Sequence, residues 1–180
     1  MLRAQFISKK EIRSILEELQ KRAEIDPQFI AYLKEFEDDV KKIVEEKFEI
    51  VVFGATPALF KTQKTPFYIP TLYVINVMYN TKKVAIVPAV VVDEGAVNHL
   101  KNGADVMIPG IRKIMKGFTQ NSIVSVLEPS EKYFLVVGYA LIDSTQIVPG
   151  AKGKAIKNVS RIDDDIWRAS LQIAKTLSSS

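Results

Sequence analysis

The side chains that usually perform enzyme chemistry are scarce in this chain. It contains no cysteine and one histidine, His99, which excludes thiol catalysis, thiolate zinc sites and disulfides. The three consecutive carboxylates Asp163–Asp165 lack the spacing of a calcium loop. Gly150–Ala155 has too few residues between its glycines for a phosphate-binding loop, and it ends in alanine where that loop needs Ser or Thr. We therefore expect a protein that is not an enzyme and that uses no metal or cofactor.

The chemistry that remains is the binding of phosphate groups by lysine and arginine. The net charge is +4, and residues 81–180 carry all of the excess, because residues 1–80 hold 12 basic and 12 acidic side chains. Two windows in the second half, 106–127 and 144–161, contain no acidic residue. Such a basic patch is the usual electrostatic footprint of a nucleic acid ligand. The candidate phosphate-binding side chains are Arg112, Lys113, Lys152, Lys154 and Lys157.

The first third of the chain has the pattern of helices. Ser8–Glu11 has the spacing of a capping box, and the apolar residues that follow it fall on one helical face. Asp26–Pro27 is a second helix start. The apolar stripe beyond it predicts helical structure as far as Val44. After Lys47 the period changes, and the sequence predicts two strands, Phe48–Phe53 and Leu72–Tyr79, with a loop at 61–70 between them.

The second half has the pattern of a small β-domain with one helix. Asp93 caps this helix, and Gly103 follows its end. Short apolar runs separated by turns suggest a small barrel; the predicted strands are Val84–Val87, Val90–Val92, Ser122–Glu128, Tyr133–Leu141 and Gly153–Val159. The predicted fold class is therefore α+β. An α+β module at residues 1–80 precedes a mostly-β pseudo-barrel at 81–172 and a C-terminal tail at 173–180.

Four segments of the second half resemble a known family in the expected order. Val91–Ile111 strongly resembles the signature of the PUA domain, an RNA-binding module named after pseudouridine synthases and archaeosine transglycosylases. Tyr133–Ala140 resembles the family's apolar strand ending in Gly-x-Ala, and Gly153–Ile156 resembles its Gly-Lys-Ala strand. Asp164–Trp167 resembles its closing element, with Asp164 where glycine is common. The order and size of the N-terminal half resemble the pre-PUA module of the malignant T-cell-amplified sequence family and its archaeal counterparts.

The resemblance implies an RNA groove formed by the helix after Asp93, the strand that follows it and the Gly-Lys-Ala strand. Small residues in the first helical turn would leave backbone amides open to phosphate, and Gly103–Ala104 would let a base or ribose lie against the backbone. Packing is an equal explanation for Gly95, and helix termination alone explains Gly103. With the cations above, the predicted RNA-binding set is Gly95, Ala96, Lys101, Gly103, Ala104, Met107, Arg112, Lys113, Lys152, Lys154 and Lys157.

Together these features predict a non-catalytic RNA-binding protein associated with translation or the ribosome. The resemblance implies that it recognises structured RNA, either the acceptor end of tRNA or rRNA. The N-terminal module would then dock on the small ribosomal subunit or on an initiation-factor-1-like protein. The alternatives are a protein-interaction adaptor and an accessory subunit of an RNA-modification enzyme. The longest apolar run, Val84–Val92, has nine residues, whereas a membrane span needs about 20. With no signal sequence at the N-terminus, we expect a cytoplasmic protein without a membrane partner.

Overall fold

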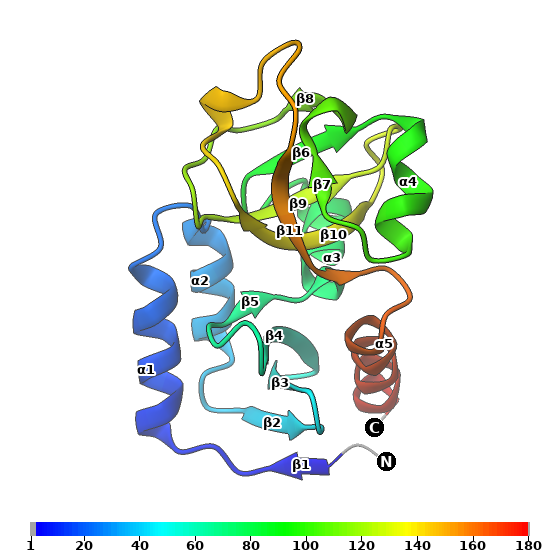
Figure 1. Ribbon diagram of the computed structural model, residues 1–180. Coiled ribbons are helices and arrows are strands. Elements are labelled where there is room, and N and C mark those ends of the chain that lie inside the picture. Colours follow the sequence, from blue (N-terminus) through cyan, green and yellow to red (C-terminus); the bar gives the residue numbers. More distant parts are fainter. Residues whose placement is uncertain (1–2, 180) are drawn as a thin grey trace.

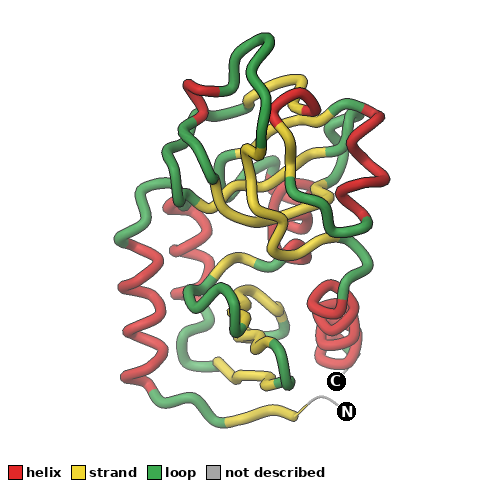
Figure 2. The backbone as a smooth tube through the Cα atoms, viewed as in Figure 1, coloured by secondary structure: helices red, strands yellow, loops and turns green. Residues whose placement is uncertain are grey.

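The computed structural model describes residues 3–179 and contains two β-sheets, one above the other, with helices around them (Figures 1 and 2). In chain order the elements are β1 (Arg3–Gln5), α1 (Lys9–Gln20), α2 (Pro27–Glu35), β2 (Val40–Val44), β3 (Phe48–Phe53), β4 (Thr56–Thr62), β5 (Ile69–Pro70), α3 (Leu72–Lys82), β6 (Ala89–Val92), α4 (Glu94–Lys101), β7 (Val106–Met107), the 3-10 helix η1 (Ile108–Gly110), β8 (Ile111–Ile114), β9 (Ile123–Leu127), β10 (Phe134–Ala140), the 3-10 helix η2 (Ser144–Gln146), β11 (Lys154–Arg161) and α5 (Asp165–Ser178).

The N-terminal sheet has five antiparallel strands in the order β1-β2-β3-β4-β5. Helices α1 and α2 lie together at one flank of this sheet, and α5 lies at the other (Figure 1). Both helix starts predicted from sequence are confirmed, because Ser8 caps α1 and Asp26 caps α2; the Glu11 carboxylate, however, accepts from the Lys42 Nζ at 2.7 Å and does not complete a capping box. These caps fix where two apolar helical faces begin, so that the faces meet the sheet.

The structure contradicts three predictions for the N-terminal half. The loop expected at 61–70 is shorter, because strand β4 continues to Thr62 and strand β5 begins at Ile69. Helix α2 ends at Glu35, and Val40–Val44 forms strand β2 instead of more helix. Its β-branched residues favour extended backbone. Conversely, Leu72–Lys82 is helix α3 and not a strand, with the hydroxyl of Thr71 accepting the N–H of Val74 at its start. Helix α3 contacts both sheets, and a helix covered on two sides loses the one-sided apolar stripe by which helices are recognised.

The C-terminal sheet has six strands in the order β7-β11-β10-β9-β6-β8, antiparallel except for the pair β6–β9. The strands expected near Val90, Ile123, Phe134 and Lys154 are present, which confirms the α+β class with a C-terminal pseudo-barrel. The segment Val84–Val87, in contrast, is not a strand.

The C-terminal end of the described chain differs from the sequence interpretation. Asp163 lies in a turn, and the carboxylate of the next residue, Asp164, accepts the N–H of Trp167 at 2.7 Å and starts helix α5. The helix continues through residue 173, where the sequence interpretation began a tail, and it buries Ile173 against the N-terminal sheet. No helix within residues 3–179 is long and apolar enough to cross a membrane.

The two sheets share a core and are joined by specific hydrogen bonds. One continuous apolar cluster runs from Ile7 through residues of both sheets to Ile173. Asn76 on α3 pairs with Phe134 on β10 in both directions: its Oδ1 accepts the N–H at 2.7 Å, and its Nδ2 donates to the carbonyl at 3.2 Å. The carboxylate of Glu24 accepts the N–H of Ile123 at 2.8 Å. The α+β half therefore fixes the position of the barrel half.

Strands β10 and β11 approach each other unusually closely at Gly138. The pairing register shifts there, because Val137 pairs with Ser160 and Gly138 pairs with Asn158, which leaves Val159 as an extra residue on β11. A Cβ built on Gly138 would lie 1.7 Å from the carbonyl oxygen of Lys157. Only glycine permits this approach, which sets the position of the backbone that carries Lys157.

We predict that Gly138→Ala destabilises the protein by about 3 kcal/mol or more, because the new methyl group meets backbone that cannot rotate away. Urea unfolding measures this difference. Gly95→Ala is the matched control: its Cβ would meet only the Asp93 carboxylate, at 3.5 Å, so its stability should stay within about 1 kcal/mol of the wild type. Equal stability of the Gly138→Ala variant and the wild type would contradict the close approach.

Candidate nucleic-acid interface

A cleft of about 720 Å³ lies between α4, the turn after β7 and strand β11, and we call it the α4–β11 cleft. Two lysines stand at its edge, and its wall combines small residues with larger side chains; the larger ones are Asp93, His99, Leu100, Asp105, Met107 and Pro109. The residues predicted from sequence that line it are Gly95, Ala96, Gly103, Ala104, Met107, Lys154 and Lys157. One continuous segment, residues 93–110, and the distant strand β11 thus bring most of the predicted set together.

The start of α4 is open to solvent at Gly95. The carboxylate of Asp93 accepts the N–H of Ala96 at 3.1 Å, and the Asp93 N–H donates to the carbonyl of Gly110 at 2.9 Å. A Cβ on Gly95 would be in ordinary contact with Asp93 and nothing else within 4 Å. Packing therefore does not require glycine here. The lack of a side chain leaves this turn of the helix accessible from the cleft.

The end of α4 is held by Gly103 and Arg161. Gly103 has φ of +96°, a left-handed conformation that terminates the helix. The Arg161 Nε donates to the carbonyl of Lys101 at 2.8 Å, which satisfies a carbonyl at the end of the helix. A Cβ on Gly103 would lie 3.5 Å from the Arg161 guanidinium. Backbone conformation thus explains Gly103, and its bare surface also gives Arg161 room beside the cleft.

Lys154 and Lys157 stand on the same side of β11 because the strand is irregular between them. In a regular strand, residues three apart point to opposite faces. In the pairing with β7, Lys154 is opposite Met107 and Ile156 is opposite Val106, so Ala155 is an extra residue. Ala155 and Ile156 are both buried, whereas Lys154 and Lys157 are both exposed. This bulge turns both ammonium groups toward the cleft.

Asp105 connects these two lysines to the loop after α4. Its carboxylate lies 3.2 Å from the Lys154 Nζ and 3.6 Å from the Lys157 Nζ, and it accepts the N–H of Asn158 at 3.0 Å. Burial of the carboxyl raises its pKa, but the Asn158 N–H and the two ammonium groups together outweigh burial and leave the pKa of Asp105 below its ordinary value. The carboxylate thus stays ionised and holds both cations at the cleft edge.

Asn158 is a positioning residue that the sequence did not single out. Its side-chain Nδ2 donates to the carbonyl of Leu100 at 3.1 Å and to the carbonyl of Ala104 at 2.9 Å. Strand β11 is thereby attached to the end of α4 on the other side of the cleft. Asp105 was missed as well, because it lies one residue outside the acid-free window that drew attention to its neighbours.

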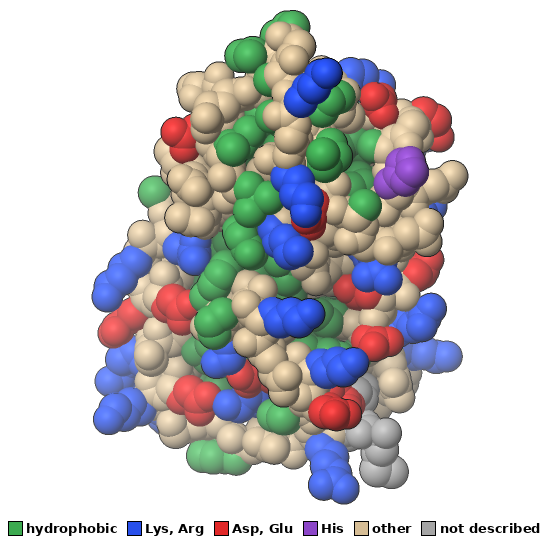
Figure 3. All heavy atoms as spheres, viewed as in Figure 1, with side chains coloured by type: hydrophobic (Ala, Val, Ile, Leu, Met, Phe, Trp, Pro, Cys, Tyr) green, Lys and Arg blue, Asp and Glu red, His purple; other side chains and the backbone are tan. Residues whose placement is uncertain are grey.

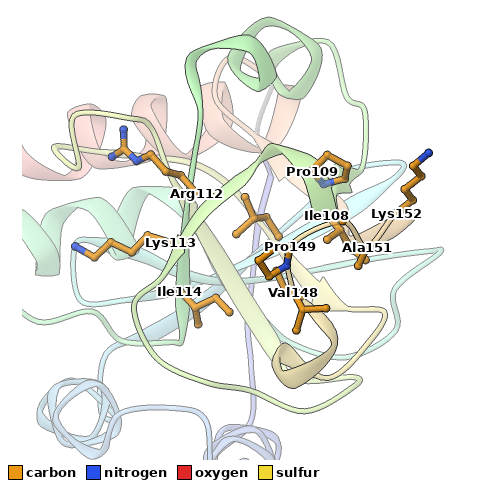
Figure 4. Close-up of a pocket in the computed structure, with 12 residues that line it drawn as sticks. Ile108, Pro109, Arg112, Lys113, Ile114, Val148, Pro149, Ala151 and Lys152 are labelled. Carbon is orange, nitrogen blue, oxygen red and sulfur yellow. The ribbon is translucent and has the colours of Figure 1, made fainter.

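The other predicted cations lie elsewhere. Arg112, Lys113 and Lys152 line a second pocket, of about 560 Å³, between β8 and the loop before β11. Figure 4 shows Arg112 and Lys113 at one side of this pocket and Lys152 at the other, with apolar residues such as Ile114 and Val148 between them. Lys101 is exposed on α4 and lines neither hollow.

Basic residues from a segment without acids can still lie next to acidic residues from another part of the chain. Glu131 lies 3.8 Å from Arg112 and 3.2 Å from Lys113, and the Arg112 guanidinium also donates to the carbonyl of Pro129 at 2.7 Å. Within residues 3–179 no ion pair is formed by Lys152. The same part of the chain holds no group of three or more His, Cys, Asp or Glu side chains suited to a metal ion.

Comparison with known proteins matches the PUA domain model to residues 88–162. An uncharacterized protein of Methanocaldococcus jannaschii is 34% identical over 162 residues, covering 90% of this chain and 93% of that protein. Malignant T-cell-amplified sequence 2 of mouse is 31% identical over 134 residues, covering 72% of this chain and 71% of that protein. Translation machinery-associated protein 20 of Eremothecium gossypii is 26% identical over 132 residues, covering 70% and 69%.

A solved structure is similar over nearly the whole chain. The crystal structure of a PUA domain from Aeropyrum pernix K1, a tartrate complex, matches with a TM-score of 0.76 and 28% identity, covering 97% of this chain and 94% of that one. The similarity therefore includes the N-terminal sheet as well as the barrel. The ordered motifs, the helix–strand cleft and these matches agree: the chain belongs to the family of PUA-domain proteins that includes the malignant T-cell-amplified sequence proteins and their archaeal counterparts.

Proposed function

We propose that this protein is a non-catalytic RNA-binding protein of the translation machinery and that its RNA ligand occupies the α4–β11 cleft. One observation carries the proposal: the bulge at Ala155 and the carboxylate of Asp105 place Lys154 and Lys157 together at the edge of a cleft whose lining includes the bare surface of Gly95, Ala96, Gly103 and Ala104. Cations at an open rim suit phosphates, and a bare wall suits ribose and bases. The relationship to a translation machinery-associated protein supports the cellular setting.

In this proposal recognition occurs by positioning. Lys154 and Lys157 contact phosphates and supply affinity that depends on salt, because each contact releases counterions from the RNA. The surface at Gly103 and Ala104 allows a ribose or base to lie against the backbone, and the exposed start of α4 at Gly95 faces the same cleft. Selection then depends on the shape of a structured RNA, for which we propose the acceptor end of tRNA or a segment of rRNA.

We further propose a division of labour between the two parts of the chain. The N-terminal module, residues 1–80, would dock on the small ribosomal subunit or on an initiation-factor-1-like protein while residues 81–172 hold RNA. The neutral charge of residues 1–80 favours protein contact over nucleic acid across most of that surface. The shared core fixes the direction in which the cleft would face once the module is docked. This function belongs in the cytoplasm.

We expect the double variant Lys154→Gln and Lys157→Gln to bind unfractionated tRNA or small-subunit rRNA about 10-fold more weakly than the wild type. The slope of log affinity against log salt should fall by about 1.4, because two phosphate contacts are lost. Glutamine is used because glutamate would stand beside Asp105. Filter binding across a salt series measures both quantities.

The control for this experiment removes the same charge elsewhere. Lys9 and Lys10 are exposed on α1, far from β11 in the fold (Figure 1), so Lys9→Gln with Lys10→Gln should leave the affinity nearly unchanged. Unaltered binding by the Lys154 and Lys157 variant would remove the cleft from consideration. No saturable RNA binding by the wild type would instead favour a protein-interaction adaptor.

We predict that Asp105→Asn lowers stability by about 1–2 kcal/mol at pH 7, where the wild-type carboxylate is ionised and paired. Because the folded pKa of Asp105 is depressed, this stabilisation is present above the unfolded pKa of about 4 and is lost as pH falls through the folded value. The stability difference between the variant and the wild type should therefore be smaller at pH 3 than at pH 7. Urea unfolding at both pH values measures this, with exposed Asp38→Asn as the control. A difference that does not change with pH would contradict the pairing.

A further inference from the structure

A third hollow lies next to the α4–β11 cleft, on the side of the N-terminal sheet. It has a volume of about 500 Å³, and we call it the junction groove; the charged residues that line it are Lys47, Lys64, Lys157, Arg161, Asp164 and Asp165. Lys157 lines both hollows, so the two adjoin at this residue of β11. Figure 3 shows Lys and Arg side chains following one another down the middle of this face, from the barrel to the N-terminal sheet.

The N-terminal half contributes cations from turns that are firmly held. The N–H of Thr65 donates to the hydroxyl of Thr62 at 2.9 Å, which closes the turn that carries Lys64. Gln63 attaches this turn to the neighbouring one: its N–H donates to the carbonyl of Lys47 at 3.3 Å, and its Nε2 donates to the carbonyl of Glu46 at 3.0 Å. Lys47 and Lys64 are therefore presented side by side, and both are exposed.

The acidic residues of the junction groove oppose these cations only in part. The carboxylate of Asp164 accepts the Trp167 and Arg161 N–H groups and the Ser160 hydroxyl, at 2.7, 3.0 and 2.8 Å. Its lone pairs are thus used to start α5 and to fix the end of β11. Within residues 3–179 no ion pair is formed by Lys47, Lys64 or Arg161, so their charges are available to a ligand.

We propose that a single strand of RNA leaves the α4–β11 cleft at Lys157 and continues through the junction groove, with its phosphates on Arg161, Lys64 and Lys47. Lys157 and Arg161 are four residues apart on β11 with the extra residue Val159 between them, so they are separated by at most about 13 Å along the strand. The adjoining cleft, three cations without an ion pair among residues 3–179 (Lys47, Lys64 and Arg161), and polar Thr62, Gln63 and Asn158 favour a nucleic acid backbone over an acidic peptide. This inference rests on the proposed function and extends its binding site to the N-terminal half.

The test compares two RNA hairpins that differ only in the length of a single-stranded 3′ extension, of about 4 or about 12 nucleotides. Fluorescence anisotropy measures their affinities for the full chain. The wild type should bind the longer extension more tightly. Lys47→Gln with Lys64→Gln should weaken binding of the long extension by about 10-fold, lower its salt slope by about 1.4, and leave binding of the short one unchanged.

The same probes separate failure of this inference from failure of the proposed function. Lys154→Gln with Lys157→Gln should weaken binding of both RNAs, and Lys9→Gln with Lys10→Gln should affect neither. If the Lys47 and Lys64 variant binds both RNAs like the wild type, the junction groove is not on the RNA path, although the cleft still is. An equal loss for both RNAs would show a general attraction for polyanions and overturn the inference. No binding by the wild type would overturn both proposals.

Discussion

The ionised carboxylate of Asp105 is the interaction on which the geometry of the cleft depends. It lies where the loop after α4 meets β11, and it contacts one backbone N–H and two ammonium groups there. Without it, the ammonium groups of Lys154 and Lys157, on the same side of β11, would repel one another and move apart into solvent. A buried charge is tolerated at this point because several donors compensate for its lost hydration, which is the same balance that depresses its pKa.

The position of β11 depends in turn on the strands and helices behind it. Glycine at position 138 lets the backbone of β11 approach β10, and Asn158 attaches the same strand to the end of α4. On the far side of β10, the side chain of Asn76 joins α3 to Phe134 by two hydrogen bonds. Helix α3 also contacts the N-terminal sheet. A displacement of either sheet would therefore be transmitted to the cleft, because densely packed interiors do not absorb such shifts.

The charges of this protein illustrate why a linear count of acids and bases is insufficient. Arg112 and Lys113 lie in a window without acids, yet Glu131 approaches both from the turn between β9 and β10. Lys47 and Lys64 lie in a half of the chain that is neutral overall, yet the fold places them beside Arg161 in one groove. Electrostatic interactions fall off over about 10 Å in salt, so proximity in space, and not in sequence, decides which charges act together.

The sequence alone determined the family, the α+β class, the caps of α1, α2 and α4, and some of the residues at the two ends of α4 that line the cleft, namely Gly95, Ala96, Gly103 and Ala104. These features are encoded by short segments, in which a capping side chain or a glycine acts on its immediate neighbours. The tertiary structure alone decided that Val40–Val44 is a strand, that Leu72–Lys82 is a helix, and that α5 begins at Asp165. It also decided which lysines share a site. Each of these outcomes depends on contacts between residues far apart in the chain. A run of apolar residues that is compatible with both a helix and a strand adopts the one that buries it against neighbouring elements. The bulge that turns Lys154 toward Lys157 exists only in the pairing of β11 with β7.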